Sequence, residues 1–442
     1  LSCCIVRQIT ASECLAPLPT PPTSAAAAEA SSEAEAASTS GMGATLPHPV
    51  TSKALYRDGD DHYRLGAAEM HGWRIHMEDA MTMRLSLSEK HPNLSMFGVY
   101  DGHRGSRCSA FLREHLPGTI GALDNPCDKS ELATALVNLD QKYLKDLNVR
   151  LDGSTCVFAL CQPLGGAEGA KKGYKVTVAN VGDSRAILIR QNGRMVPLTV
   201  DHKPENPVEK RRIINAGGYV KHNRVDGQLA LSRAFGDWSY KNNTDLPYHS
   251  QKVIALADIT NEIMYEGDTL LICCDGLFEQ LSREDVANCI HRKLKDDRFT
   301  DPAIAVASLL DYVIEQGSKD NMSCICIRME DGKDYSGRAP QFIPGKFHEY
   351  KEEQDFVRAY FADAKKYGVS RQKLLAMIPP PNDSRDDNSV RAALKRRSSL
   401  NLIGFALAIS FTIFILPEYR ALISFMMFFI VVGLIAHYPS AL

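Results

Sequence analysis

Short apolar runs separated by polar turns fill the middle of the chain, and this pattern predicts many strands. Residues 155–161, 175–180 and 185–190 are rich in Val, Ile, Ala and Cys, as strands of a buried sheet usually are. The last two runs are joined by only the four residues 181–184, a connection too short for a parallel crossover. We therefore expect antiparallel pairing.

Between these runs, apolar residues recur at spacings of three and four, which predicts helices. The expected helices span residues 106–115, 129–148, 206–216, 283–295 and 302–316. Strand-rich stretches flanked by helices favour an α+β fold of stacked antiparallel sheets with helices outside, rather than a doubly wound parallel sheet.

Changes in composition divide the chain into five expected parts. The first 50 residues are mostly Ala, Ser, Glu, Pro and Thr, a composition typical of disordered chain. Within them, Met42-Gly43 resembles a translation start, and Gly43 would then be open to myristoylation, although Pro47 stands where Ser or Thr is preferred. The expected parts are a tail (1–50), a folded domain (51–335), a helical extension (336–381) with a helix over 349–367, a polar and basic linker (382–400), and a membrane segment (401–438).

Two almost wholly apolar runs, 402–416 and 421–436, form the membrane segment. Each would reach about 23 Å as a helix, somewhat short of the bilayer core. A helical hairpin places the polar residues 417–420 at the far interface, whereas one continuous span would bury Glu418 and Arg420. A single tail anchor and a buried soluble hairpin are the alternatives. The basic cluster Lys395–Arg397 predicts that the folded domain lies on the cytosolic side, and the short spans suit the thin membrane of the endoplasmic reticulum.

Charge and cysteine content narrow the possible functions. The 442 residues carry a formal net charge of -2, and no basic run interleaved with aromatics indicates nucleic-acid binding. The 12 cysteines lack the paired spacing of a zinc site, and several fall within predicted strands as small buried apolar groups. We expect a monomer in a reducing compartment.

Three acidic residues stand at the boundaries of predicted strands: Asp101 and Asp275 close their strands, and Asp320 precedes the strand that begins at Ser323. The first two are followed by glycine, so each strand delivers a carboxylate to the rim of a sheet and then turns. Carboxylate oxygens are ligands that Mg²⁺ and Mn²⁺ prefer. Either Asp-Gly pair alone is equally typical of a plain hairpin turn, but three such endings suggest a shared metal centre.

Further polar motifs accompany these acids. In residues 70–79, Arg74 precedes the acidic pair Glu78 and Asp79 by four and five positions. The other motifs are Asp101-Gly102-His103, Asp152-Gly153-Ser154-Thr155, Asn180 to Arg185, Asp201-His202-Lys203-Pro204, Gly227 to Asp237, Asp275-Gly276 and Asp320-Asn321. In order and spacing, from Tyr63 to Arg328, this set resembles the metal-dependent serine/threonine protein phosphatases of the PPM or type 2C family.

The resemblance implies a four-layer αββα sandwich with a two-metal centre at one end, loaded with Mg²⁺ or Mn²⁺. It also implies roles for individual residues. Asp101 would bridge both metals, the Gly102 carbonyl would bind one, and Asp275 and Asp320 would bind the other. Glu78 and Asp79 would hold coordinated waters, Asn321 would support Asp320, Arg74 would grip the substrate phosphate, and Asp183 would hold a weaker third metal, for which Glu279 stands where the family usually has Asp.

The expected reaction is hydrolysis of phosphoserine and phosphothreonine in proteins by direct attack of a water activated by two metals. His103, beside the bridging carboxylate, would be the general acid, or it would merely hydrogen-bond the site. Residues 201–241 resemble the family's flap beside the active site. A cysteine-based phosphatase is excluded because no cysteine has an arginine five residues beyond it in a phosphate-binding loop. The remaining alternative is a membrane-anchored pseudophosphatase that binds phosphoproteins without turnover.

Overall fold

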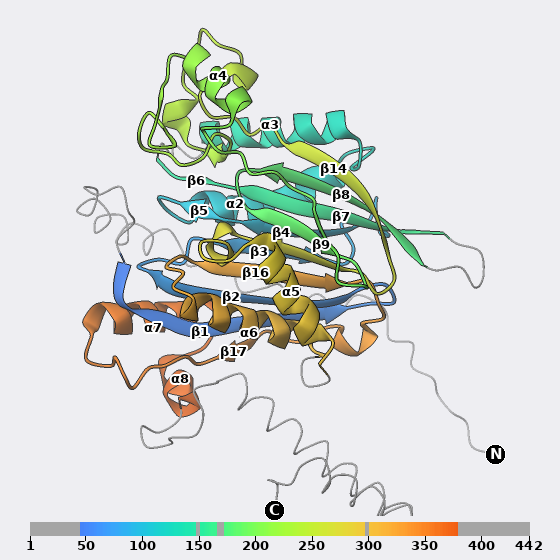
Figure 1. The fold of residues 1–442 in the computed structure, drawn as a ribbon, viewed down its shortest axis with the longest axis vertical. Coiled ribbons are helices and arrows are strands. Elements are labelled where there is room, and N and C mark those ends of the chain that lie inside the picture. Colours follow the sequence, from blue (N-terminus) through green and yellow to red (C-terminus); the bar gives the residue numbers. More distant parts are fainter. Residues whose placement is uncertain (1–44, 147–150, 166–171, 297–299, 379–442) are drawn as a thin grey trace, which may run out of the picture. The chain divides into compact units, whose positions relative to one another are not determined.

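Two antiparallel sheets form the centre of the protein (Figure 1). The computed structural model describes residues 45–146, 151–165, 172–296 and 300–378. The larger sheet has seven strands in the order β10-β9-β15-β16-β2-β1-β17. In chain order these are β1 (Thr45–Gly59), β2 (Arg64–Arg74), β9 (Arg185–Ile189), β10 (Met195–Pro197), β15 (Thr269–Cys273), β16 (Met322–Arg328) and β17 (Gln341–Ile343).

The second sheet has five strands in the order β14-β8-β7-β4-β3. Its members are β3 (Ala80–Arg84), β4 (Ser95–Tyr100), β7 (Cys156–Leu164), β8 (Gly173–Val181) and β14 (Asp258–Tyr265). The described residues also form two small sheets. One has the order β13-β6-β5, with β5 (Gly102–His103), β6 (Gly153–Ser154) and β13 (Phe235–Gly236), and the other pairs β11 (Val220–Lys221) with β12 (Arg224–Val225).

Alternating side chains explain how the two large sheets stack. In β4, Phe97 and Val99 belong to the core between the sheets, whereas Met96 and Tyr100 belong to a second core under the outer helices. Successive side chains of a strand point to opposite faces, so a strand buried on both faces is apolar at every position. This is why β4 appears in the sequence as a continuous apolar run.

Helices cover the outer face of each large sheet. On the five-stranded sheet lie α2 (Arg107–Gly121) and α3 (Lys129–Asp146), and on the seven-stranded sheet lie α5 (Arg283–Leu294) and α6 (Pro302–Glu315). A Cβ at Gly66 in β2 would lie 2.0 Å from the backbone nitrogen of Ala303, so α6 packs on β2 at a distance that only glycine permits. The predicted α+β fold with helices outside two antiparallel sheets is confirmed.

The bounds of the predicted helices needed correction in two cases. The helix expected over 349–367 is α7 (Gln354–Lys366), because residues 349–353 form turns instead. We expected the first helix to end at residue 115, before Leu116-Pro117-Gly118, but α2 continues to Gly121. Leu116 and Ile120 are both fully buried in the core under this helix. Burial of these side chains therefore outweighs the local preference of proline and glycine for ending a helix. The helix expected over residues 206–216 is α4 (Pro207–Asn215), within the stretch 201–241.

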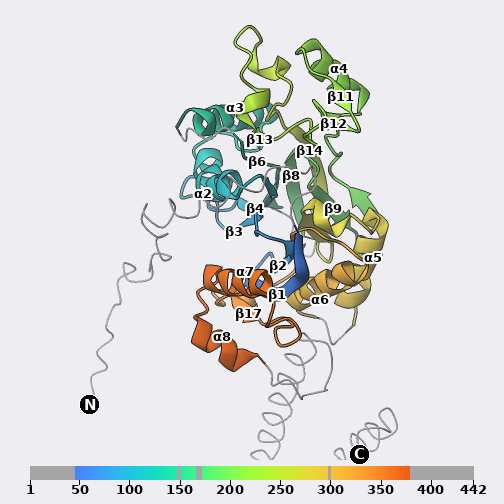
Figure 2. The same cartoon turned by 90° about the vertical axis from the view of Figure 1, so that its left-hand side faces the viewer.

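The seven-stranded sheet also includes residues expected to lie outside the domain. Residues 45–50, assigned to the tail, belong to β1, and Leu46 and Val50 are buried in it. In the expected extension, β17 pairs with β1, and helices α7 (Gln354–Lys366) and α8 (Arg371–Met377) lie beside them (Figure 2). The two segments belong to the folded unit because Leu46 and Val50 pack with apolar side chains of β17, α7 and α8 in one hydrophobic cluster.

Among the described residues, no helix combines the length and the apolar character that crossing a bilayer requires. The predicted membrane runs 402–416 and 421–436, the basic cluster 395–397 and Gly43 all lie outside the described residues.

Candidate metal centre

The predicted metal-binding acids lie where strands of both large sheets end. Asp101 follows β4, and Asp79 immediately precedes β3, both in the five-stranded sheet. In the seven-stranded sheet, Asp275 follows β15 and opens the short helix η4 (Asp275–Leu277), and Asp320 lies two residues before β16. Because β15 and β16 are neighbours, their acidic ends lie at the same edge of the sandwich.

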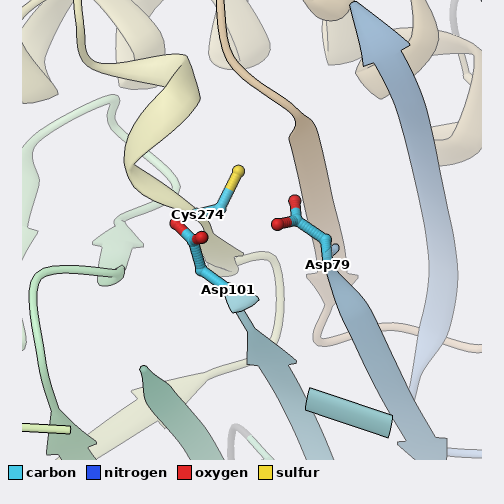
Figure 3. Close-up of side chains that lie close together, drawn as sticks. All are labelled: Asp79, Asp101 and Cys274. Carbon is cyan, nitrogen blue, oxygen red and sulfur yellow. The ribbon is translucent and has the colours of Figure 1, made fainter. Parts of the chain in front are cut away.

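These carboxylates are close enough to interact strongly. Ligand atoms of Asp79, Asp101 and Cys274 all lie within 4.8 Å of one another (Figure 3). Burial raises the pKa of Asp101 well above its usual range, and the negative charges of Asp275, Asp79 and Asp320 raise it further. Burial likewise raises the pKa of Asp275, reinforced by Asp183 and Asp320. The site therefore gathers negative charge that the neighbouring side chains do not fully compensate.

A divalent cation fits this arrangement. Asp79 is 4% exposed, burial raises its pKa to about 7, and no described protein group hydrogen-bonds to its Oδ2 atom. Buried carboxylate oxygens without partners are uncommon unless a proton, a water or an ion satisfies them. The carboxylate oxygens gathered here are hard donors, which suit Mg²⁺ or Mn²⁺.

Cys274 is an unexpected neighbour of these acids, because the sequence offers it only as a small buried residue of a strand. Its sulfur accepts a hydrogen bond from the backbone nitrogen of Ser323 at 3.1 Å. Burial raises the pKa of the Cys274 thiol well above its usual range, and the adjacent carboxylates add to this effect. The thiol is therefore neutral, and a neutral sulfur is a poor ligand for a hard cation.

Arg74, Asp320 and Asn321 form a connected group at the rim of the site. An Nη2 hydrogen of Arg74 is donated to Oδ2 of Asp320 at 2.6 Å, and the Arg74 side chain is 37% exposed. The backbone nitrogen of Asn321 donates to Oδ1 of Asp320 at 2.7 Å. The amide side chain of Asn321 also accepts from the backbone nitrogen of Glu78 at 2.9 Å. Asn321 thus contacts both Asp320 and the segment that carries the acidic pair.

Gly102 and His103 form the two-residue strand β5. A Cβ at Gly102 would lie 2.5 Å from the backbone oxygen of Glu78, so only glycine fits this close approach. The imidazole of His103 is hydrogen-bonded to the carboxylate of Asp237, a residue to which the sequence assigned no role. Burial lowers the pKa of His103, but the charge of Asp237, its hydrogen bond to the imidazole and the charge of Glu78 together outweigh burial and raise the pKa.

The two acids considered for a third metal each have a protein partner. Lys203 forms an ion pair with Asp183, which is 4% exposed. Glu279 is exposed and accepts hydrogen bonds from the Ser318 hydroxyl at 2.9 Å and from the backbone nitrogen of Lys319 at 2.7 Å.

A two-sheet sandwich that gathers poorly solvated carboxylates at the ends of its strands, with a partly exposed arginine beside them, is the arrangement expected of a metal-dependent hydrolase. Comparison with known proteins identifies the kind. The family model described as "Protein phosphatase 2C" matches residues 63–322, and the chain belongs to this family. It is a metal-dependent protein serine/threonine phosphatase.

Individual relatives agree with this assignment. A probable protein phosphatase 2C of Caenorhabditis elegans is 34% identical over 304 residues, covering 66% of this chain and 82% of the relative. Protein phosphatase 2C homolog 2 of Schizosaccharomyces pombe is also 34% identical over 304 residues, covering 65% and 78%. The crystal structure of a phosphatase from Toxoplasma gondii is similar with a TM-score of 0.58 and 28% identity, covering 66% of this chain and 98% of that one.

Proposed function

We propose that this phosphatase hydrolyses phosphoserine and phosphothreonine in proteins directly, without a covalent phosphoenzyme. Asp101, the Gly102 carbonyl, Asp275 and Asp320 would hold two Mg²⁺ or Mn²⁺ ions, with Glu78 and Asp79 around them, and Asp183 is proposed for a weaker third. When bound, such ions supply a water of lowered pKa and neutralise charge on the phosphoryl oxygens. The observation that carries this proposal is the convergence of carboxylates at the strand ends, where removal from solvent and then the charges of the other carboxylates raise the pKa values of Asp101 and Asp275.

Arg74 is the proposed phosphate-binding residue. Its guanidinium donates one hydrogen bond to Asp320 and remains 37% exposed, so further donors are available to an incoming phosphate. The hydrogen bond with Asp320 also orients the fork of donors before substrate arrives. Holding the phosphate in one orientation contributes to catalysis by reducing the entropy lost on reaching the transition state.

His103 is the proposed general acid. The oxygen of serine or threonine is a poor leaving group as an alkoxide, so proton donation as the P–O bond breaks lowers the barrier. The imidazole is 21% exposed, so part of its surface is accessible to a bound substrate.

Release of phosphate from a phosphothreonine peptide in the presence of Mn²⁺ tests this proposal. The unsubstituted protein should turn over, and Asp275→Asn should reduce the rate by at least about 10³-fold because a metal ligand is lost. Asp334→Asn is the matched control, since Asp334 is exposed and pairs with Arg64 away from the centre. Metal-independent turnover would refute the mechanism, and no turnover by the unsubstituted protein would favour the pseudophosphatase alternative.

The membrane association is a separate proposal, supported by the sequence of residues 401–438. We infer that these residues anchor the protein as a hairpin or a single tail anchor, with the catalytic domain in the cytosol and the endoplasmic reticulum as the suggested membrane. The two apolar runs and the preceding basic cluster support this orientation.

A further inference from the structure

The contact between His103 and Asp237 extends the proposed function to a residue outside the metal-binding set. The His103 Nε2 atom lies 2.7 Å from Oδ2 of Asp237. The Asp237 side chain has no exposed surface, whereas that of His103 is 21% exposed. We propose that Asp237 is a positioning residue: it holds the imidazole through Nε2 and leaves Nδ1 as the nitrogen that delivers the proton to the leaving oxygen. This inference depends on the general-acid role proposed for His103.

The small sheet β13-β6-β5 is built around this contact. His103 in β5 and Gly236 in β13 both pair with Gly153, which lies in β6 between them. A Cβ at Gly153 would lie 2.4 Å from Oδ2 of Asp237 and 2.5 Å from Nε2 of His103. The absent side chain of Gly153 therefore leaves the space in which the imidazole and the carboxylate meet. Three strands from distant parts of the chain hold the two groups in register.

Asp237 is itself held in an uncommon backbone conformation. Its φ of 53° and ψ of 46° lie in the left-handed region, which residues other than glycine adopt rarely. The preceding residue is fixed from the other side, because the backbone nitrogen of Gly236 donates to Oδ1 of Asp140 at 2.7 Å. Asp140 in α3 also forms a fully buried ion pair with Lys241 at 2.7 Å. A helix of the outer layer thus supports the turn that aims the Asp237 carboxylate.

The two ring nitrogens of His103 then have different roles. A carboxylate oxygen accepts, so Nε2 donates its hydrogen to Asp237, and the orientation of the ring is set by that bond. As the P–O bond to serine or threonine breaks, the proton on Nδ1 moves to the departing oxygen, and the ring is left neutral with its hydrogen on Nε2. A proton released from the attacking water restores the ring for the next turnover.

Two substrates with different leaving groups test this assignment. The leaving group of a phosphothreonine peptide is an alkoxide and needs the proton. The leaving group of p-nitrophenyl phosphate is a stable phenolate and does not. Asp237→Asn should lower kcat about 10²-fold on the peptide but by no more than about threefold on the aryl ester. His103→Gln should show the same split, and the double variant should be no slower than His103→Gln alone.

Asp226→Asn is the matched control. Asp226 also has a positive φ, of 50°, and forms an ion pair with Lys252 in the flap region. Its substitution tests whether replacing an aspartate by asparagine at a left-handed backbone position is enough to change the rates. We expect both substrates to be hydrolysed at the unsubstituted rate. An equal loss on both substrates with Asp237→Asn would overturn the inference and indicate a purely structural role.

Nuclear magnetic resonance of the metal-free full chain, labelled with ¹⁵N, gives a readout independent of turnover and of the folding of Asp237→Asn. The imidazole signals that disappear in His103→Gln identify this residue among the 13 histidines. Nε2 should carry a hydrogen-bonded proton, and an unprotonated Nε2 would overturn the inference. Failure of the proposed function is distinguishable, because the unsubstituted enzyme would then hydrolyse neither substrate.

Discussion

Replacing Asp79 by asparagine removes a buried charge from the metal centre and should stabilise the metal-free protein. Asp79 is 4% exposed, and burial raises its pKa from 3.8 to about 7. Its ionised form also raises the pKa of Asp101. Above neutral pH, in the absence of metal, the folded state must therefore keep a poorly solvated carboxylate charged beside others. Asparagine has nearly the same shape without the charge.

The size of the effect follows from the pKa. A rise from 3.8 to about 7 corresponds to roughly 4 kcal/mol, an upper limit because the enclosing residues can relax. The folded state binds a proton that the unfolded state releases, so this stabilising contribution is complete below pH 3.8 and is lost as the pH rises through about 7. At pH 8, metal-free Asp79→Asn should therefore be more stable than the unsubstituted protein, and the difference should vanish in acid.

Urea denaturation of both proteins after metal removal, across the range from pH 8 to acid, measures this difference. Asp258→Asn is a control of opposite sign, since a hydrogen bond from His202 lowers the pKa of Asp258 to about 2. Asp258 is more than half exposed, so its loss should destabilise by about 1 kcal/mol or less. This loss should be complete above pH 3.8 and should disappear as the pH falls through about 2. The reasoning is refuted if Asp79→Asn is no more stable at pH 8, or if its gain does not depend on pH.

Two further predictions concern the C-terminal part of the chain. Phe356 in α7 is fully buried against the rings of Phe347, Tyr350 and Tyr360, so Phe356→Ala should lower the free energy of unfolding by about 3 to 5 kcal/mol in urea titrations. A loss below about 1 kcal/mol would show that this cluster is not part of the core. Fractionation of cells should release the full chain from membranes with detergent and not with high salt, since the proposed anchor at 401–438 is apolar. Release by salt would contradict the anchor.

The strand ends that carry the acidic ligands were predictable because their signals are local. The apolar run of β4 and the acid that follows it are adjacent in the chain, so Asp101 could be placed at a strand end without knowledge of the fold. The same holds for Asp275 after β15. That these ends meet in space followed from the order and spacing of the motifs, through the family resemblance, rather than from any single residue.

The contacts that escaped prediction join segments far apart in the sequence. Strands β5, β6 and β13 have two residues each, too few for any periodic pattern to be recognised. The hydrogen bond between His103 and Asp237 spans 134 positions and depends on those strands. The place of Cys274 among the acids likewise depends on tertiary packing, because a buried thiol in a strand has no distinctive sequence signal.

The helical segment after residue 335 contributes to the same folded unit as the metal centre. Ser52 in β1 donates to Oδ2 of Asp363 in α7 at 2.8 Å, and both side chains are buried. The Nδ1 atom of His71, near the end of β2, lies 3.8 Å from Oδ1 of Asp363. The backbone oxygen of His71 accepts a hydrogen bond from the Asn321 side chain at 2.7 Å. A chain of contacts therefore runs from α7 to the residue that holds Asp320. The step from Asp363 to His71 is a close approach rather than a hydrogen bond, since both ring nitrogens of His71 are buried without a hydrogen-bond partner among the described residues. Helix α7 therefore lies in contact with the strand that leads to the catalytic end, as well as covering the edge of the sheet.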